Sequence, residues 1–178
     1  MPKSKILIIE NSKNVTGALK SITRSSYDLT SYFQFSFVIP RGSHGKFWIV
    51  NKGFTDVMEL PMKELRRDIW SVITYLPKLL VNAVRLNNIV KKNHIDIVHV
   101  NDVYNLLPVA IRLLGSSIPY VCHFRFLPDR FPSLLLKLWM KFHLRFASAV
   151  VAVSESVKVQ LPSHPKIIVI HNELPIEE

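Results

Sequence analysis

This sequence of 178 residues has little cysteine and no long apolar run, and these absences exclude several protein classes. Its single cysteine, Cys122, cannot form an intramolecular disulfide and agrees with a reducing compartment. No uncharged run reaches the roughly 18 residues that a membrane-spanning helix needs. The apolar run near the N-terminus ends at Glu10 and is too short for a signal peptide. The 48% hydrophobic content excludes a disordered or low-complexity chain.

Common catalytic signatures are also missing. The sequence contains neither GxGxxG nor a P-loop, so a standard dinucleotide or nucleoside-triphosphate loop is not expected. It contains no HExxH or CxxC, and its seven histidines do not have metal-ligand spacing, so we expect no metal site. The absence of GxSxG leaves a serine nucleophile unsupported.

The charge balance is strongly positive, with 23 Lys and Arg against 13 Asp and Glu and a net charge of +10. Such a balance favours an anionic partner, which could be phosphate, nucleic acid or an acidic membrane surface. An ordinary basic surface exposed to solvent would give the same net charge. We expect no nucleic-acid partner, because no RRM, KH or similar signature occurs.

Short apolar runs alternate with helical patterns along the chain. Strands that are apolar on both faces and separated by helices indicate a doubly wound, mostly parallel α/β sheet of the Rossmann-like class. We predict strands over Lys5–Ile9, Phe33–Pro40, Ile95–Val100, Pro119–His123, Ala149–Val153 and Lys166–Ile170, with extended segments at Phe47–Val50 and Asp56–Leu60. We predict helices over Val15–Ser25, Glu64–Asn93 with a kink at Pro77, Val103–Leu114, Ser133–Ala147 and Glu155–Leu161.

Length predicts one domain over residues 1–172, and the acidic, proline-containing residues 173–178 look like the start of a linker.

Polar residues gather where the predicted strands end, and ligands of parallel α/β sheets bind beyond those carboxyl ends. His123 and Arg125 are the most suggestive pair, since a histidine there can bond a hydroxyl or move a proton, and an arginine can bind phosphate or carboxylate. An ion pair between Arg125 and Asp129 is an equally good explanation. His99, within a strand, fits a buried core histidine best.

Two further strand ends carry candidate binding residues. The loop from Asn11 to Gly17 opens a helix and could approach phosphate, although an ordinary loop capped by Asn14 or Thr16 explains it better. Asn101 and Asp102 could each cap the following helix, and Asp102 could accept a hydrogen bond from a hydroxylated substrate.

The segment Leu134–Phe146 has a basic amphipathic pattern. Lys137, Lys141 and Arg145 recur every four residues and predict one stripe, with Leu135, Leu138, Trp139, Phe142 and Phe146 largely on the other side. A core-facing helix with a solvated basic edge explains the apolar face. A helix lying on an anionic membrane is the alternative use of the basic stripe.

Five sequence pieces occur in a familiar order. IDIVHVND is followed by a helix ending in RLLG, then by IPYVCHF, AVVAVSES and KIIVIHN. This order resembles the N-terminal half of family-four glycosyltransferases of the GT-B fold. The resemblance covers Ile95–Asn172 well and rests earlier only on KILIIE and FVIP.

The resemblance implies roles for individual residues. His123 matches a family histidine near the transferred sugar, where it contacts a hydroxyl. Thr16 and Gly17 align with a Gly-Gly loop at the donor diphosphate, with one glycine missing. Asn101 replaces the second histidine of an H-x-H element, which leaves Asp102 as the neighbouring polar group. Together with Arg125, these two residues would line the acceptor cleft.

The resemblance also concerns residues near the end of the sequence and the domain organisation of the complete enzyme. Ser154 and Glu155 match a serine-containing pair at a helix start, and the usual Pro-Asn-Gly turn is replaced by His171, Asn172 and Glu173. GT-B enzymes have a second, C-terminal domain that holds the nucleotide sugar, and we expect that domain to be absent from this chain.

The function implied is that of an acceptor-binding domain. The complete enzyme would transfer a sugar of the hexose type from a nucleotide sugar to a glycan or lipid-linked acceptor, with retention of configuration, in polysaccharide or cell-surface glycan synthesis. No cofactor is expected beyond the nucleotide-sugar co-substrate, and the domain alone would be inactive. The expected location is the cytoplasm, at the inner face of the membrane. The alternative is a non-catalytic module that binds an anionic glycan, a nucleotide or a membrane surface.

Overall fold

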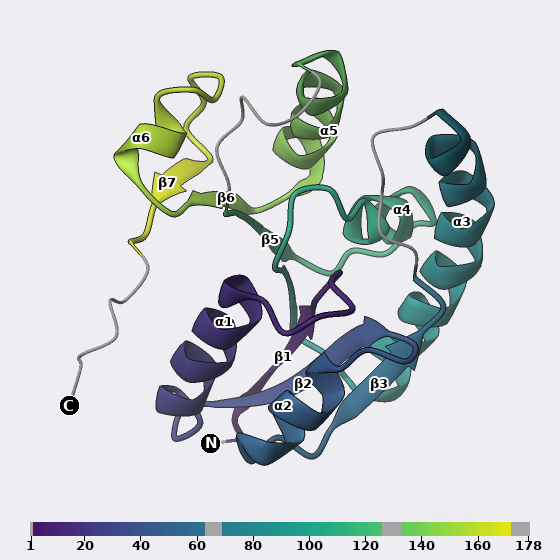
Figure 1. Ribbon diagram of the computed structural model, residues 1–178, viewed down its shortest axis with the longest axis vertical. Helices are drawn as coiled ribbons and strands as arrows, with labels where there is room; N and C mark the ends of the chain where they lie inside the picture. Colours follow the sequence, from purple (N-terminus) through teal and green to yellow (C-terminus); the bar gives the residue numbers. More distant parts are fainter. Residues whose placement is uncertain (1, 63–68, 126–132, 172–178) are drawn as a thin grey trace.

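The computed structural model describes residues 2–62, 69–125 and 133–171, without the side chains of residues 69–74 and Ser133. Its centre is a seven-stranded sheet in the order β3-β2-β1-β4-β5-β6-β7, in which every neighbouring pair is parallel (Figure 1). The strands are β1 Ser4–Ile9, β2 Phe33–Pro40, β3 Val57–Leu60, β4 Ile97–Val100, β5 Tyr120–Phe124, β6 Ala149–Ala152 and β7 Ile167–Val169. The predicted fold class is confirmed.

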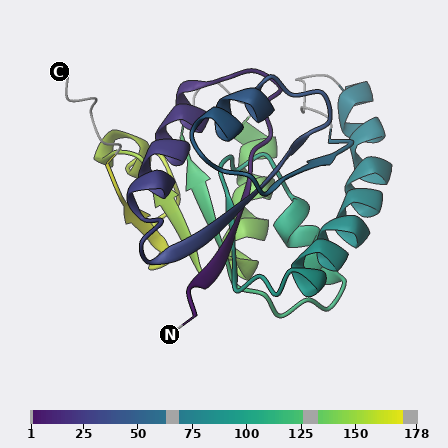
Figure 2. The same cartoon turned by 90° about the horizontal axis from the view of Figure 1, so that it is seen from below.

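Helices cover both faces of this sheet (Figures 1 and 2). They are α1 Gly17–Asp28, α2 Gly45–Asn51, α3 Ile69–Lys92, α4 Leu107–Leu113, α5 Ser133–Phe146 and α6 Glu155–Lys158. Two buried clusters hold the layers together. The smaller one joins α1 and α2 to the sheet through residues such as Leu19, Ile49 and Phe37. The larger one joins α3, α4 and α5 to the opposite face, and includes Leu86, Ile111 and Trp139.

Alternation along the strands decides which side chains meet which helices. In β1, Ile8 belongs to the α1–α2 cluster, whereas Leu7 and Ile9 belong to the opposite cluster. All three are fully buried, as expected for a strand covered on both faces.

Two predicted elements show the largest differences from the structure. Phe47–Val50 was predicted to be extended, but it lies inside helix α2. Of the four residues only Ile49 is buried, and Phe47 is 74% exposed. The β propensity of these residues therefore does not decide the local structure, which is set by packing. Helix α4 begins at Leu107 rather than at Val103, with Pro108 in its first turn.

Two long helices agree with their predicted ranges where the structure describes them, and residues 64–68 of the first predicted range lie outside the described residues. Helix α3 continues through Pro77 without ending there. Helix α5 buries Trp139, Met140 and His143, and its three predicted cations, Lys137, Lys141 and Arg145, are exposed. Leu138, predicted to lie on the apolar side, is 44% exposed.

Candidate functional site

Five polar side chains cluster on the α1 face of the sheet, at the carboxyl ends of its central strands. Glu10 follows β1, His99 and Asn101 lie at the end of β4, and His123 and Arg125 lie at the end of β5. Their odd–even spacing along β4 and β5 places them on the face opposite to Val100, Cys122 and Phe124, which belong to the larger core. We call these five residues the polar cluster.

The cluster begins at a buried carboxylate. Oε1 of Glu10 accepts hydrogen bonds from the backbone N–H groups of Asn11 and Ser12, each at 3.0 Å. Its Oε2 accepts a 2.6 Å bond from Nδ2 of Asn101, and Oδ1 of Asn101 accepts a 2.7 Å bond from Nε of Arg125. Glu10 is 3% and Asn101 1% exposed, so the bond between them is buried, whereas the bond from Arg125 to Asn101 is only partly buried.

The other side of Arg125 fixes the state of His123. Nη2 of Arg125 lies 3.2 Å from Nδ1 of His123, and Nε2 of His99 lies 3.1 Å from the same atom. Because a guanidinium can only donate, Nδ1 of His123 is an acceptor, which assigns the proton of a neutral ring to Nε2. Among the residues that the structure describes, Nε2 of His123 is buried and has no hydrogen-bond partner.

Burial and neighbouring charge keep both rings neutral. Burial, then the charge of Arg125, then His99 lower the pKa of His123 to about 2. Burial and then Arg125 lower the pKa of His99 to about 4. The pKa of Arg125 is itself lowered to about 10 by burial, against the opposing effect of Glu10 and Asp102. At neutral pH the site therefore presents a fixed imidazole N–H and a guanidinium charge.

A hollow of about 340 Å³ lies beside the polar cluster. Its polar wall includes Ser21, His99, His123 and Arg125, and its remaining wall is largely apolar. Nη1 of Arg125 lies 3.4 Å from Oγ of Ser21, which connects the cluster to helix α1. A buried network of charged and imidazole side chains beside a partly apolar hollow indicates a binding site rather than core packing.

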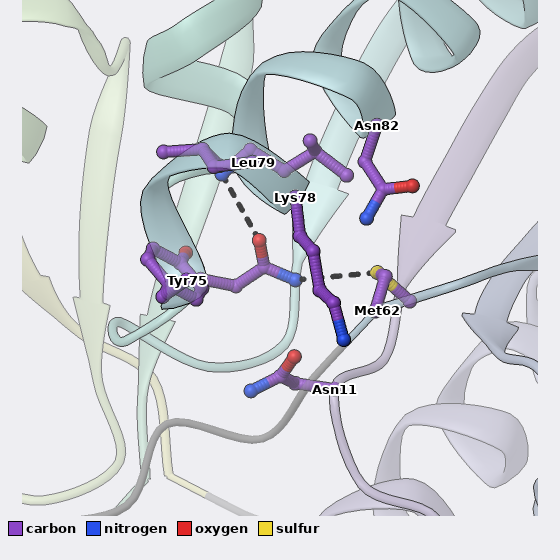
Figure 3. Close-up of a pocket in the computed structure, with 8 residues that line it drawn as sticks. Asn11, Met62, Tyr75, Lys78, Leu79 and Asn82 are labelled. Carbon is purple, nitrogen blue, oxygen red and sulfur yellow. Dashed lines mark hydrogen bonds between the residues drawn. The ribbon is translucent and has the colours of Figure 1, made fainter. Parts of the chain in front are cut away.

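A second, much smaller cavity opens on the α3 side (Figure 3). Its volume of about 10 Å³ corresponds to one water molecule. The amine of Lys78 points toward Met62 and Asn11 there. Nδ2 of Asn82 donates to the Pro61 carbonyl at 3.3 Å, while its buried Oδ1 has no partner among the described residues.

The candidates at the start of α1 have local roles. Oγ1 of Thr16 accepts a 3.1 Å bond from the Leu19 N–H, so Thr16 is the N-cap. Gly17 is exposed, and an added Cβ would have no heavy atom within 4 Å. Neither Gly17 nor Asp102 lines the 340 Å³ hollow.

The remaining described candidates support a turn or the short helix α6. Oδ1 of Asp102 accepts a 3.0 Å bond from the Tyr104 N–H, so Asp102 supports the turn before α4 and is not that helix's N-cap. Ser154 caps α6 through a 3.2 Å bond from the Val157 N–H. Glu155 forms an exposed 3.8 Å ion pair with Lys158. Asp129, the alternative partner of Arg125, lies outside the described residues.

The structure therefore brings Asn101, His123 and Arg125 into one network, and it adds Glu10 and His99, which sequence reasoning did not choose as site residues. The alternation in IDIVHVN was a signal for His99, because it places His99 and Asn101 on one face. Within the described ranges, no group of three or more His, Cys, Asp or Glu side chains could hold a metal. No helix there is long and apolar enough to cross a membrane.

Comparison with known proteins gives a family and a set of folds. The family model for Glycosyltransferase Family 4 matches residues 57–177, which is about two-thirds of the chain. No curated protein matches.

Among solved structures, HepE of Anabaena in complex with UDP and glucose has a TM-score of 0.71 and 18% identity, covering 96% of this chain and 45% of that one. A glycosyltransferase of Rickettsia africae gives 0.66 and 19%, covering 96% and 43%. A UDP-N-acetylglucosamine 2-epimerase gives 0.64 and 13%, covering 96% and 49%.

These likenesses establish the fold, and the epimerase shows that the fold alone does not define one reaction. The present chain spans less than half the length of each of these three structures.

Proposed function

Because this chain belongs to Glycosyltransferase Family 4, we propose that it supplies the acceptor-side half of an enzyme that transfers a sugar from a nucleotide sugar to a glycan or lipid-linked acceptor. HepE, which shares the fold, was solved with UDP-glucose, which supports a nucleotide-sugar donor. The proposal includes retention of configuration, a role in polysaccharide or cell-surface glycan synthesis, and a cytoplasmic site at the inner membrane face. It also includes a C-terminal domain that carries most donor contacts.

The observation that carries this proposal is the buried Nε2–H of His123, which has no hydrogen-bond partner among the residues that the structure describes. A buried donor without an acceptor costs roughly 1–3 kcal/mol. A sugar hydroxyl that accepts from this N–H would recover that cost, so the site favours a hydroxylated ligand. Arg125 and His99 act as positioning residues, because their contacts with Nδ1 keep the N–H at Nε2.

The role proposed for His123 is hydrogen bonding, not proton transfer. A general base needs a pKa near the working pH, and the pKa of His123 is lowered far below that range. The start of α1, with Thr16 and Gly17, is the proposed place for the donor diphosphate, since free N–H groups and the helix dipole favour an anion there. Asn11, Asn101, Asp102, Ser154 and Glu155 remain proposed contacts of the bound substrates.

The test uses the longest natural protein that contains these 178 residues. His123→Ala should lower kcat strongly while the circular-dichroism spectrum and the Tm remain close to those of the parent. His44→Ala, at an exposed histidine, is the matched control and should retain full turnover.

The ratio of parent to His123→Ala turnover should be constant from about pH 5.5 to 8, since a neutral donor does not titrate there. A ratio that changes steeply across this range would show proton transfer by His123. Unchanged kcat in His123→Ala would remove His123 from the site.

A second candidate function is binding of an anionic ligand without catalysis. A groove of about 570 Å³ between α1 and α2 is lined by Lys20, Arg24, Trp48 and Lys52, among others. The amines of Lys20 and Lys52 lie 5.4 and 5.1 Å from the Trp48 ring centroid. Saturable binding of a sulfated or phosphorylated oligosaccharide that Lys20→Gln/Lys52→Gln abolishes, in a protein without transferase activity, would favour this function.

A further inference from the structure

Helix α3 exposes apolar side chains where a surface helix is normally polar. Leu76 is 54%, Leu80 60%, Val81 51% and Val84 53% exposed. Leu76, Leu80 and Val84 are spaced by four residues and lie along one face, with Val81 beside them. We call these four residues the α3 stripe. The other face of the helix is buried in the larger core through Ala83, Leu86 and Val90, so the stripe is not needed to hold the helix in place.

The charged residues of helix α3 are all positive. Arg85 is exposed beside the α3 stripe, and Lys91 and Lys92 are exposed near the end of the helix. Lys78 is also exposed, with its amine directed toward the cavity of Figure 3. The sequence of α3 contains no Asp or Glu among its 24 residues. An exposed apolar band bordered by cations is the pattern of helices that lie in the plane of a membrane surface.

We propose that the α3 stripe docks this protein on an anionic lipid bilayer. The apolar side chains would enter the boundary between headgroups and acyl chains, while Arg85 would contact anionic headgroups. Helix α3 would then lie along the surface of the bilayer.

The charge distribution distinguishes a bilayer from a second copy of this chain. Two α3 stripes packed against each other would bring the cations of both helices together without any acid from either α3. Like charges across an interface are unfavourable, whereas an anionic surface compensates every one of them. The net charge of +10 adds long-range attraction in the same direction.

The structure also separates α3 from α5, the helix whose basic pattern suggested membrane contact in the sequence. Helix α5 exposes two leucines, Leu134 at 78% and Leu138 at 44%, beside its three cations. It can attract an acidic surface, but among the side chains that the structure describes it offers two exposed apolar side chains, against four in the α3 stripe. The α3 stripe also lies on the same helical turns as Lys78 and Leu79, which line the cavity of Figure 3.

This inference does not depend on transferase activity, so it is tested by binding alone. The 178-residue chain is sedimented with phosphatidylcholine vesicles that contain or lack phosphatidylglycerol, at low and at high salt. The test variant is Leu76→Ser/Leu80→Ser, and the matched control is Leu134→Ser/Leu138→Ser, with the same change on α5. All four leucines are at least partly exposed, so both variants should remain folded, which circular dichroism checks.

The parent should bind phosphatidylglycerol vesicles in a salt-sensitive manner. Leu76→Ser/Leu80→Ser should weaken the partition coefficient about tenfold or more. The α5 control should change it less than threefold, and Arg85→Gln should weaken it about fivefold, as expected for one surface cation.

Three results would overturn the proposal. Absence of parental binding to anionic vesicles would refute membrane docking. Loss of binding only in the α5 control would assign the contact to α5. A parental dimer in sedimentation that Leu76→Ser/Leu80→Ser converts to monomer, with no vesicle binding, would assign the stripe to self-association.

Discussion

Lowering the pH from 7 to 5 should destabilise this protein through its buried histidines. His143 is fully buried in α5, with Nε2 2.7 Å from the Val103 carbonyl and Nδ1 3.3 Å from the Tyr120 hydroxyl. Burial lowers its pKa to about 4, although the hydrogen bond to Val103 opposes this. The pKa of buried His123 is lowered in the same direction, to about 2.

The sign follows from proton binding in the two states. Unfolded histidines have a pKa near 6.5, so between this value and the folded pKa the unfolded chain binds more protons. Stability is therefore retained above about pH 6.5 and lost as the pH falls. Each of these two buried histidines contributes a loss of about 2 kcal/mol between pH 7 and 5. His123 and His143 together give about 4 kcal/mol, and the partly exposed His99 adds to the loss.

The assay is urea unfolding of the 178-residue chain at pH 7 and pH 5, followed by circular dichroism. In His143→Gln the loss between the two pH values should be smaller by about 2 kcal/mol, whatever the variant does to stability at pH 7. His44→Gln, on the surface, should leave the loss unchanged. A loss in His143→Gln equal to that of the parent would refute the reasoning for this histidine.

Two further substitutions test the core and the start of α1. Phe37→Ala should reduce the free energy of unfolding by about 3–5 kcal/mol, because Phe37 is fully buried, whereas Phe47→Ala, at a 74% exposed ring, should change it by less than about 0.5 kcal/mol in urea unfolding. Gly17→Ala should leave the Tm within a few degrees, because its Cβ would meet open space. In the longest natural protein, Gly17→Ala should raise the KM for the nucleotide sugar if the diphosphate approaches this backbone, and an unchanged KM would exclude that approach.

Substitutions within the polar cluster should not have additive effects on stability. Hydrogen bonds join Glu10 to Asn101 and Asn101 to Arg125, so a change at one of these residues affects the others. Gly17 and His143 lie outside these bonds, which makes them suitable for independent tests.

Local patterns in the sequence determined much of the fold. The apolar run Phe33–Pro40 predicted β2 with the observed bounds, because a strand covered on both faces needs such a run. The order of the pieces after Ile95 indicated the family. Thr16 was identified as a possible N-cap because capping depends on residues three positions away, which the sequence displays directly. Helix α2 was missed because its seven residues carry too little helical periodicity to outweigh their β propensity.

Only the tertiary structure decided how the site is assembled. Glu10 and Asn101 are 91 residues apart, and Ser21 and Arg125 are 104 apart, yet each pair is joined by a hydrogen bond. Sequence alternation assigns a side chain to a face of its strand, but strand order and register determine which neighbour it meets. The pairing of β1 with β4, and of β4 with β5, brings Glu10, Asn101 and Arg125 together at one sheet edge. The exposed apolar stripe of α3 has the same origin, since burial of one helix face depends on which elements pack against it.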